Sequence, residues 1–159
     1  MARALRFAVL VAGLGLGVFS LAVARGGAGN SFGGGSAFAG AAELAAGYAL
    51  LGVGFAALLR PRQARLGAIL AAASGAWFLL EWNNPAAGSA FVFTVGLVFY
   101  AAAAPLVAHA MLAYPDGRVA WWPGRLGLAF GYAGAFVTSR RIAVFAMVML
   151  ARPDLTALR

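Results

Sequence analysis

Few side chains in this sequence of 159 residues have the chemistry that catalysis or metal binding requires. The sequence holds a single histidine, His109, four carboxylates and no cysteine. Two of the carboxylates, Asp116 and Asp154, stand in a turn and in the C-terminal tail. A zinc site or a catalytic acid–base pair needs more such groups close together, and no nucleotide-binding motif is present. We therefore expect no enzyme activity, no bound metal and no cofactor.

His109 is the first candidate for a sensing group, because it stands inside an apolar run five residues before Tyr114. Pro105 lies one helical turn earlier on the same face. Since Pro105 cannot donate a hydrogen bond to the carbonyl of Ala101, we expect a kink there. A protonatable group at a bent helix could sense pH or a ligand. Alternatively, His109 bonds to a neighbouring helix or reaches the interface, and the residues favour this second interpretation.

Two glutamates are the other candidates, because each is expected at the outer end of a membrane helix. Glu43 falls in the first turn of one predicted helix, and Glu81 lies near the end of the next. Aromatic and amide residues stand close to Glu81 in the sequence: Trp77, Trp82, Asn83 and Asn84. Neighbouring helices could bring the two carboxylates into one outward-facing polar pocket. The alternative is two separate carboxylates at the membrane interface, and the residues favour it slightly.

The composition decides the class of protein that carries these groups. Hydrophobic residues make up 64% of the chain, charged residues only 10%, and the mean hydropathy is +0.89. A soluble domain has about 25% charged residues, so this chain could not cover its own surface with polar groups. The net charge of +8 comes from arginines between apolar runs. These arginines are typical of topology signals and lipid anchors, so the expected partner is a lipid bilayer and not nucleic acid.

The apolar runs predict an all-α, polytopic transmembrane helical bundle in a single domain, residues 1–159. Four spans are expected at residues 5–24, 41–59, 66–82 and 90–114, each close to the ~20 residues that a crossing needs. A cleaved signal peptide is the alternative for the first run. In a fifth apolar segment, residues 126–151, a crossing would place Arg140 and Arg141 near the middle of the membrane. Because each costs ~2.5–3.5 kcal/mol there, we expect helix without a firm crossing, or a broken or re-entrant helix.

The arginines also predict an orientation in the inner (plasma) membrane, with the N-terminus in the cytoplasm. Among the first four spans, only Arg25 would lie outside, in a flexible loop rich in glycine and serine, residues 25–40. The arginines expected on the cytoplasmic side are Arg3, Arg6, Arg60, Arg62, Arg65, Arg118 and Arg125. The fourth span should end in a stiff turn, because Pro115 lacks an amide donor and disfavours helix at the residue before it. That turn consists of Tyr114, Pro115, Asp116, Gly117 and Arg118.

Two short motifs flank the fourth span. Residues 81–85 read EWNNP, and residues 109–118 read HAMLAYPDGR. This pattern resembles the N-terminal membrane region of actinobacterial sensor histidine kinases, which often read W-x-N-P before such a helix and H-x-x-L-[AT]-[FY]-P-[DSG]-G-R after it. The resemblance covers about residues 45–135. It implies a sensor or input module of a two-component system. No kinase core is in this chain, and His109 inside an apolar helix is unsuited to accept a phosphate.

Three functions follow as hypotheses. The first is the input module that the resemblance implies, which signals to a cytoplasmic kinase core or another signalling protein when the helix moves at Pro105. The second is a small transporter or channel subunit that works as a homo-oligomer, although few charged residues are available to line a path. The third is a structural membrane protein with no ligand of its own.

Overall fold

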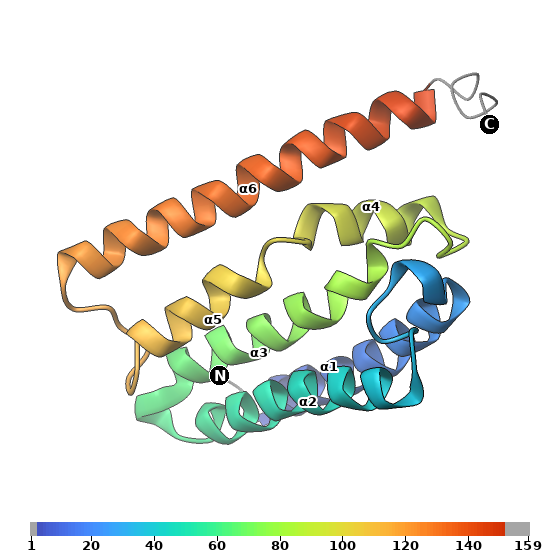
Figure 1. Ribbon diagram of the computed structural model, residues 1–159. Coiled ribbons are helices and arrows are strands. Elements are labelled where there is room, and N and C mark those ends of the chain that lie inside the picture. Colours follow the sequence, from blue (N-terminus) through green and yellow to red (C-terminus); the bar gives the residue numbers. More distant parts are fainter. Residues whose placement is uncertain (1–2, 152–159) are drawn as a thin grey trace.

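The computed structural model describes residues 3–151, and this part of the chain contains helices and no strand (Figure 1). Short 3-10 turns connect or extend the longer helices. The α-helices are α1 (Arg3–Gly26), α2 (Ala37–Leu58), α3 (Ala64–Leu79), α4 (Ala90–Phe99), α5 (Ala103–Leu112) and α6 (Trp122–Ala151). The 3-10 turns are η1 (Ala28–Asn30), η2 (Pro61–Gln63) and η3 (Leu80–Trp82).

Four helical stretches in the described residues are long and apolar enough to cross a membrane. They are Arg3–Gly26, Ala37–Leu58, Pro61–Trp82 and Ala90–Leu112, with 24, 22, 22 and 23 residues. Each therefore exceeds the ~20 residues needed to cross the hydrocarbon core. Large apolar side chains such as Val11, Phe91 and Met111 point out of the bundle, as a lipid environment requires. The predicted all-α transmembrane bundle is confirmed, and the chain is a multi-pass membrane protein.

The helices pack through small residues, for example where α2 crosses α3. A Cβ atom on Gly67 would lie 2.5 Å from the amide nitrogen of Leu58 and 2.7 Å from the carbonyl oxygen of Gly54. Only glycine permits this approach, which is typical of helix pairs in membranes. Two turns further along, the hydroxyl of Ser74 donates to the carbonyl of Gly47 over 2.8 Å. The backbone contact and this buried hydrogen bond fix the rotation of α2 against α3.

The helix boundaries differ from the prediction at the outer end of the second span. α2 begins at Ala37, four residues before the predicted start at residue 41. The cause is Ser36, whose hydroxyl accepts a hydrogen bond from the amide of Ala39 over 3.0 Å and so caps the helix. Glu43 is therefore the seventh residue of the helix, in its second turn. The prediction that it lies in the first turn is wrong.

The predicted single helix over residues 90–114 is interrupted. α4 ends at Phe99 and α5 begins at Ala103, with a turn over residues 100–102 between them. The interruption lies one turn before Pro105, which has no amide hydrogen for the carbonyl of Ala101 and whose ring crowds that carbonyl. α5 also ends two residues early, at Leu112, where the amides of Gly117 and Arg118 donate to the carbonyl of Ala113.

The last helix, α6, is continuous over 30 residues, so it extends about 45 Å. The helix expected over residues 126–151 is present, and its continuity contradicts the broken-helix alternative. It runs back along α4 and α5 at one side of the bundle (Figure 1). Whether α6 crosses the bilayer stays a prediction.

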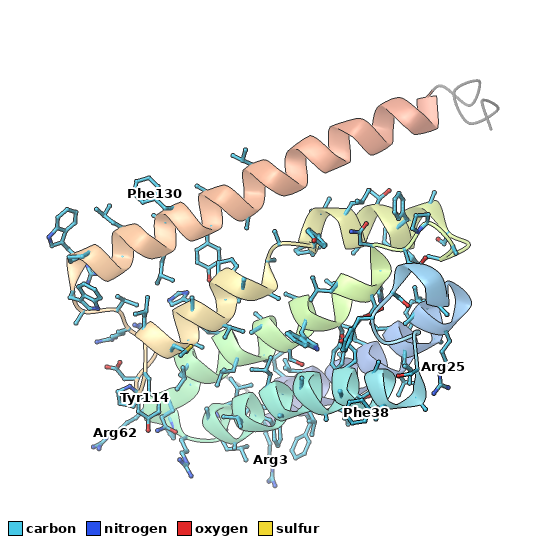
Figure 2. The ribbon with its side chains drawn as sticks, in the orientation of Figure 1. Arg3, Arg25, Phe38, Arg62, Tyr114 and Phe130 are labelled. Carbon is cyan, nitrogen blue, oxygen red and sulfur yellow. The ribbon has the colours of Figure 1, made fainter. Side chains whose placement is uncertain are left out.

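The two ends of the bundle differ in charge. Figure 2 shows Arg62 and Tyr114 at one end and Arg25 at the opposite end. Both buried carboxylates belong to the Arg25 end, since Glu43 lies near the start of α2 and Glu81 lies in η3 after α3. We call these the arginine-rich end and the carboxylate end.

Candidate functional site

The structure brings Glu43 and Glu81 together, in contrast to the alternative of two separate interfacial carboxylates. Both line a single cavity of about 430 Å³ at the carboxylate end. Each residue is only 5% exposed. The side chains that line the cavity with them are Ser31, Phe32, Trp77, Leu80, Asn83 and Tyr100. We call this space the carboxylate cavity.

The two carboxylates are incompletely bonded. Oε1 of Glu81 accepts a hydrogen bond of 3.0 Å from the amide of Gly33. Oε2 of Glu81 and Oε1 of Glu43 are buried and have no hydrogen-bond partner among the described residues. A buried, unpaired carboxylate oxygen loses its hydration without compensation, and two like charges close together add repulsion. Among the described residues, these two oxygens therefore lack the hydrogen-bond donors that would stabilise them.

Two tryptophans attach this pair to the surrounding helices. The indole nitrogen of Trp77, near the end of α3, donates to the backbone carbonyl of Glu43 over 3.2 Å. The indole nitrogen of Trp82 in η3 donates to the hydroxyl of Ser20 in α1 over 2.8 Å. Because each bond joins neighbouring helices, Glu43 and Glu81 are held by a framework of three spans.

The glycine-rich loop covers one side of the carboxylate cavity, and its flexibility stays a prediction. The hydroxyl of Ser31 donates to the carbonyl of Ala24 over 2.8 Å. The fully buried amide of Asn84 donates to the carbonyl of Gly27 over 3.2 Å. These side chains satisfy backbone acceptors at the end of α1 and hold the loop in place. A Cβ on Gly33 would lie 3.5 Å from Cγ of Glu43 and 3.6 Å from Oε1 of Glu81, so the loop backbone passes directly over the pair.

Aromatic side chains form the rim of the cavity. Phe32 is 66% exposed and Tyr100 is 44% exposed, in contrast to the buried glutamates. The sequence analysis did not identify either residue. Phe32 is one of two phenylalanines in the glycine- and serine-rich stretch, with Phe38, so an aromatic residue in that stretch was an available signal. Tyr100 reaches the cavity from the turn between α4 and α5, so it could have been found only by placing the interruption before Pro105.

Pro105 and His109 lie outside the carboxylate cavity, on α5 where it faces α6. Pro105 is buried. Nδ1 of His109 lies 3.0 Å from the hydroxyl of Tyr132 in α6, with the two rings nearly perpendicular. This geometry fits the favoured interpretation, in which His109 hydrogen-bonds a neighbouring helix.

The turn after α5 packs against the start of α3 at the arginine-rich end. Gly117 has φ of +79°, a backbone conformation that glycine adopts without strain. A Cβ there would lie 2.5 Å from the amide nitrogen of Leu66, so the turn also needs glycine to approach α3. Oδ1 of Asp116 accepts from the amide of Arg118 over 3.2 Å, and Tyr114 is exposed. Next to this turn, a second cavity of about 370 Å³ is lined by Pro61, Arg62, Arg65, Asp116 and Arg118.

Among the described residues, no three or more histidine, cysteine, aspartate or glutamate side chains gather where they could hold a metal ion. No protein-family model, curated protein or solved structure matches this chain, so its function is inferred from the residues and their geometry.

Proposed function

We propose that the chain is the input module of a membrane sensor, which receives a ligand in the carboxylate cavity and signals to a cytoplasmic partner. One observation carries the proposal: Glu43 and Glu81 line one cavity at one end of the bundle, and each has a buried carboxylate oxygen without a hydrogen-bond partner among the described residues. In a structural membrane protein with no ligand, such a pair would only lower stability, because unpaired buried carboxylates are destabilising. A receptor site, in contrast, is stabilised when its ligand arrives.

The orientation of the module rests on the arginines. Arg60, Arg62, Arg65 and Arg118 lie in or next to the loops at one end of the bundle. Since cytoplasmic loops carry an excess of arginine, this end faces the cytoplasm of the cell membrane, with the N-terminus on the same side. The carboxylate cavity then opens to the outside, where a sensor meets its stimulus.

Two elements connect the cavity to the cytoplasmic end. α3 carries Trp77 near its outer end, and its first residues touch the turn at Gly117. α5 starts directly after Tyr100 of the cavity rim and ends at the same turn. A ligand that displaces Tyr100 or Trp77 therefore acts on two helices that meet at one cytoplasmic turn, which is a helix-shift mechanism.

The cytoplasmic partner is a kinase core or another signalling protein. The membrane module would then act on its partner as the membrane region of a sensor histidine kinase acts on its kinase core. The basic cavity formed by Arg62, Arg65 and Arg118 beside the turn supports a partner contact at this end. His109 has no role as a phosphate acceptor in this proposal, because its ring lies between α5 and α6 against Tyr132.

The test is a fusion of the chain to a histidine kinase core without its own membrane region. We expect Glu43→Gln and Glu81→Gln each to change autophosphorylation by about fivefold or more, the size of a typical coupling energy. Arg25→Gln is the control, since it removes an exposed charge from the same end of the bundle without touching the cavity. Unchanged autophosphorylation in both glutamine variants would refute the sensor role.

A further inference from the structure

We propose that the carboxylate cavity binds a protonated primary amine with an apolar body. The ammonium group lies between Oε1 of Glu43 and Oε2 of Glu81, and the apolar body lies along Trp77 towards Phe32 and Tyr100 at the rim. This inference deepens the proposed function, and it rests on that function only in using the same cavity as the receptor site.

The charge of the ligand follows from the two carboxylates. Glu43 and Glu81 are each 5% exposed and line the same cavity. The basic residue in the last turn of α1, Arg25, is exposed and points away from the bundle (Figure 2). Two carboxylates in a poorly hydrated site are stabilised by a cation between them, because opposite charges attract more strongly there than in water.

The hydrogen bonds select a primary ammonium group among cations. Each of the two carboxylates that line the cavity has one buried oxygen without a hydrogen-bond partner among the described residues, while Oε1 of Glu81 accepts from the amide of Gly33. A primary ammonium has three N–H donors and can bond both free oxygens, as lysine does in ion pairs. A quaternary ammonium has no donor. Calcium prefers six to eight oxygen ligands, more than the four oxygens of two carboxylates supply.

The remaining walls select an apolar body. Phe32, Trp77, Leu80 and Tyr100 contribute aromatic and aliphatic surface around the carboxylates. Aromatic faces attract cations and also contact hydrocarbon. Exposure rises from 5% at the glutamates to 44% at Tyr100 and 66% at Phe32, so the charged bottom is buried and the aromatic rim is open. An amphiphilic amine with its charge at one end matches this gradient, and the cavity of about 430 Å³ lies within the range of small-molecule sites.

The first experiment uses the full chain in nanodiscs of phosphatidylcholine. Empty nanodiscs measure how much of each test compound partitions into the lipid without the protein. Calorimetric titration with phenethylammonium is compared with titration by 2-phenylethanol, which has nearly the same shape but no charge. We expect the amine to bind about tenfold more tightly or better, the effect of charge-assisted hydrogen bonds. Equal affinity of amine and alcohol, after correction for empty nanodiscs, overturns the proposal. This comparison needs no variant, so it remains decisive whether or not a variant folds.

The second experiment locates the binding site. Glu43→Gln and Glu81→Gln each keep the side-chain shape and remove one charge, so each should weaken amine binding about tenfold. Asp116→Asn is the matched control, because it removes an exposed carboxylate at the opposite end of the bundle and should bind like the parent chain. Amine binding that is unaffected by both glutamine substitutions, or lost equally in Asp116→Asn, contradicts a site between the glutamates.

The outcomes separate the two proposals. Amine binding that depends on the glutamates, without any change in autophosphorylation of the kinase fusion, retains the amine site and refutes the sensor role. A kinase fusion that responds to the glutamine substitutions, while the amine and the alcohol bind equally, retains the sensor role and refutes the amine as the class of ligand.

Discussion

Glycine sets the distance between α2 and α3, and that distance affects how Glu43 is oriented at the carboxylate end. Because Gly54 and Gly67 bring the two backbones into contact, the two helices cannot rotate freely against each other. The same pair of helices meets again at the cavity, where Trp77 donates to the carbonyl of Glu43. The orientation of Glu43 towards Glu81 therefore depends on small residues that are distant from the site.

Gly67→Ala tests this packing. The added methyl group would meet the backbone of Leu58 and Gly54, which cannot move away as a flexible side chain can. We expect the substitution to lower the free energy of unfolding by about 1–3 kcal/mol, the usual effect of overpacking. Thermal or denaturant unfolding in detergent measures the change.

Gly52→Ala is the matched control on α2, since nothing lies within 4 Å of a Cβ at that position. Alanine has the better helix propensity by up to about 1 kcal/mol, so this variant should be as stable as the parent chain or more stable. If Gly67→Ala and Gly52→Ala have the same free energy of unfolding, the close contact between α2 and α3 does not contribute to stability as described.

The sequence identified the side chains that could bind a ligand or a proton, but it did not identify their contacts. Glu43 and Glu81 were recognisable because carboxylates are rare in an apolar chain. Their approach to each other was not predictable, since it depends on the rotation of α2 about its axis. The partner of His109 was expected on a neighbouring helix, but Tyr132 as that partner depends on the position of α6.

At the scale of elements, the interruption between α4 and α5 has a consequence for the site. It turns the chain at residues 100–102 and leaves Tyr100 at the rim of the carboxylate cavity. The sequence predicted a kink near Pro105 from its missing amide. It did not predict a loss of helix, because that outcome also requires new partners for the free backbone groups. The amide of Ala102, for example, donates to the carbonyl of Phe99 over 2.9 Å.

Pro105→Ala should restore one continuous helix from α4 to α5. The substitution supplies an amide donor for the carbonyl of Ala101 and removes a helix penalty of up to ~3 kcal/mol, part of which packing already offsets. Spin labels on cysteines introduced at Phe91 and Met111, both exposed, report the distance between the two helices. A continuous helix separates these positions by about 30 Å along its axis, so the measured distance should change from the parental value to about 30 Å.

The control for this measurement is Pro85→Ala, which changes an exposed proline in the loop before α4. It should leave the distance between the labels unchanged. The bundle with Pro105→Ala should be equally or more stable, and in the kinase fusion it should hold one signalling state. A distance that stays at the parental value would mean that tertiary packing, and not the proline, maintains the interruption.

At the scale of the whole molecule, composition was sufficient to predict the class. A chain with 10% charged residues and long apolar runs has few alternatives to a bundle of membrane helices. The order and number of the first four spans followed from where the arginines and turns interrupt those runs. The conformation of the glycine-rich loop could not be predicted in this way, because it depends on Ser31 and Asn84 meeting backbone carbonyls at and just after the end of α1.

The orientation is the last property that the charge distribution predicts. Gln63 in η2 lies between Arg62 and Arg65 at the arginine-rich end, whereas Ala87 lies in the loop between η3 and α4 at the carboxylate end. Since arginine-rich loops stay in the cytoplasm, a reporter enzyme fused at Gln63 should show cytoplasmic activity and one fused at Ala87 should show external activity. Alkaline phosphatase, which is active only outside, and a fluorescent protein that folds inside give opposite readings at each site. The same reading at both positions would place η2 and the carboxylate cavity on one side of the membrane and contradict both the topology and the receptor site that depends on it.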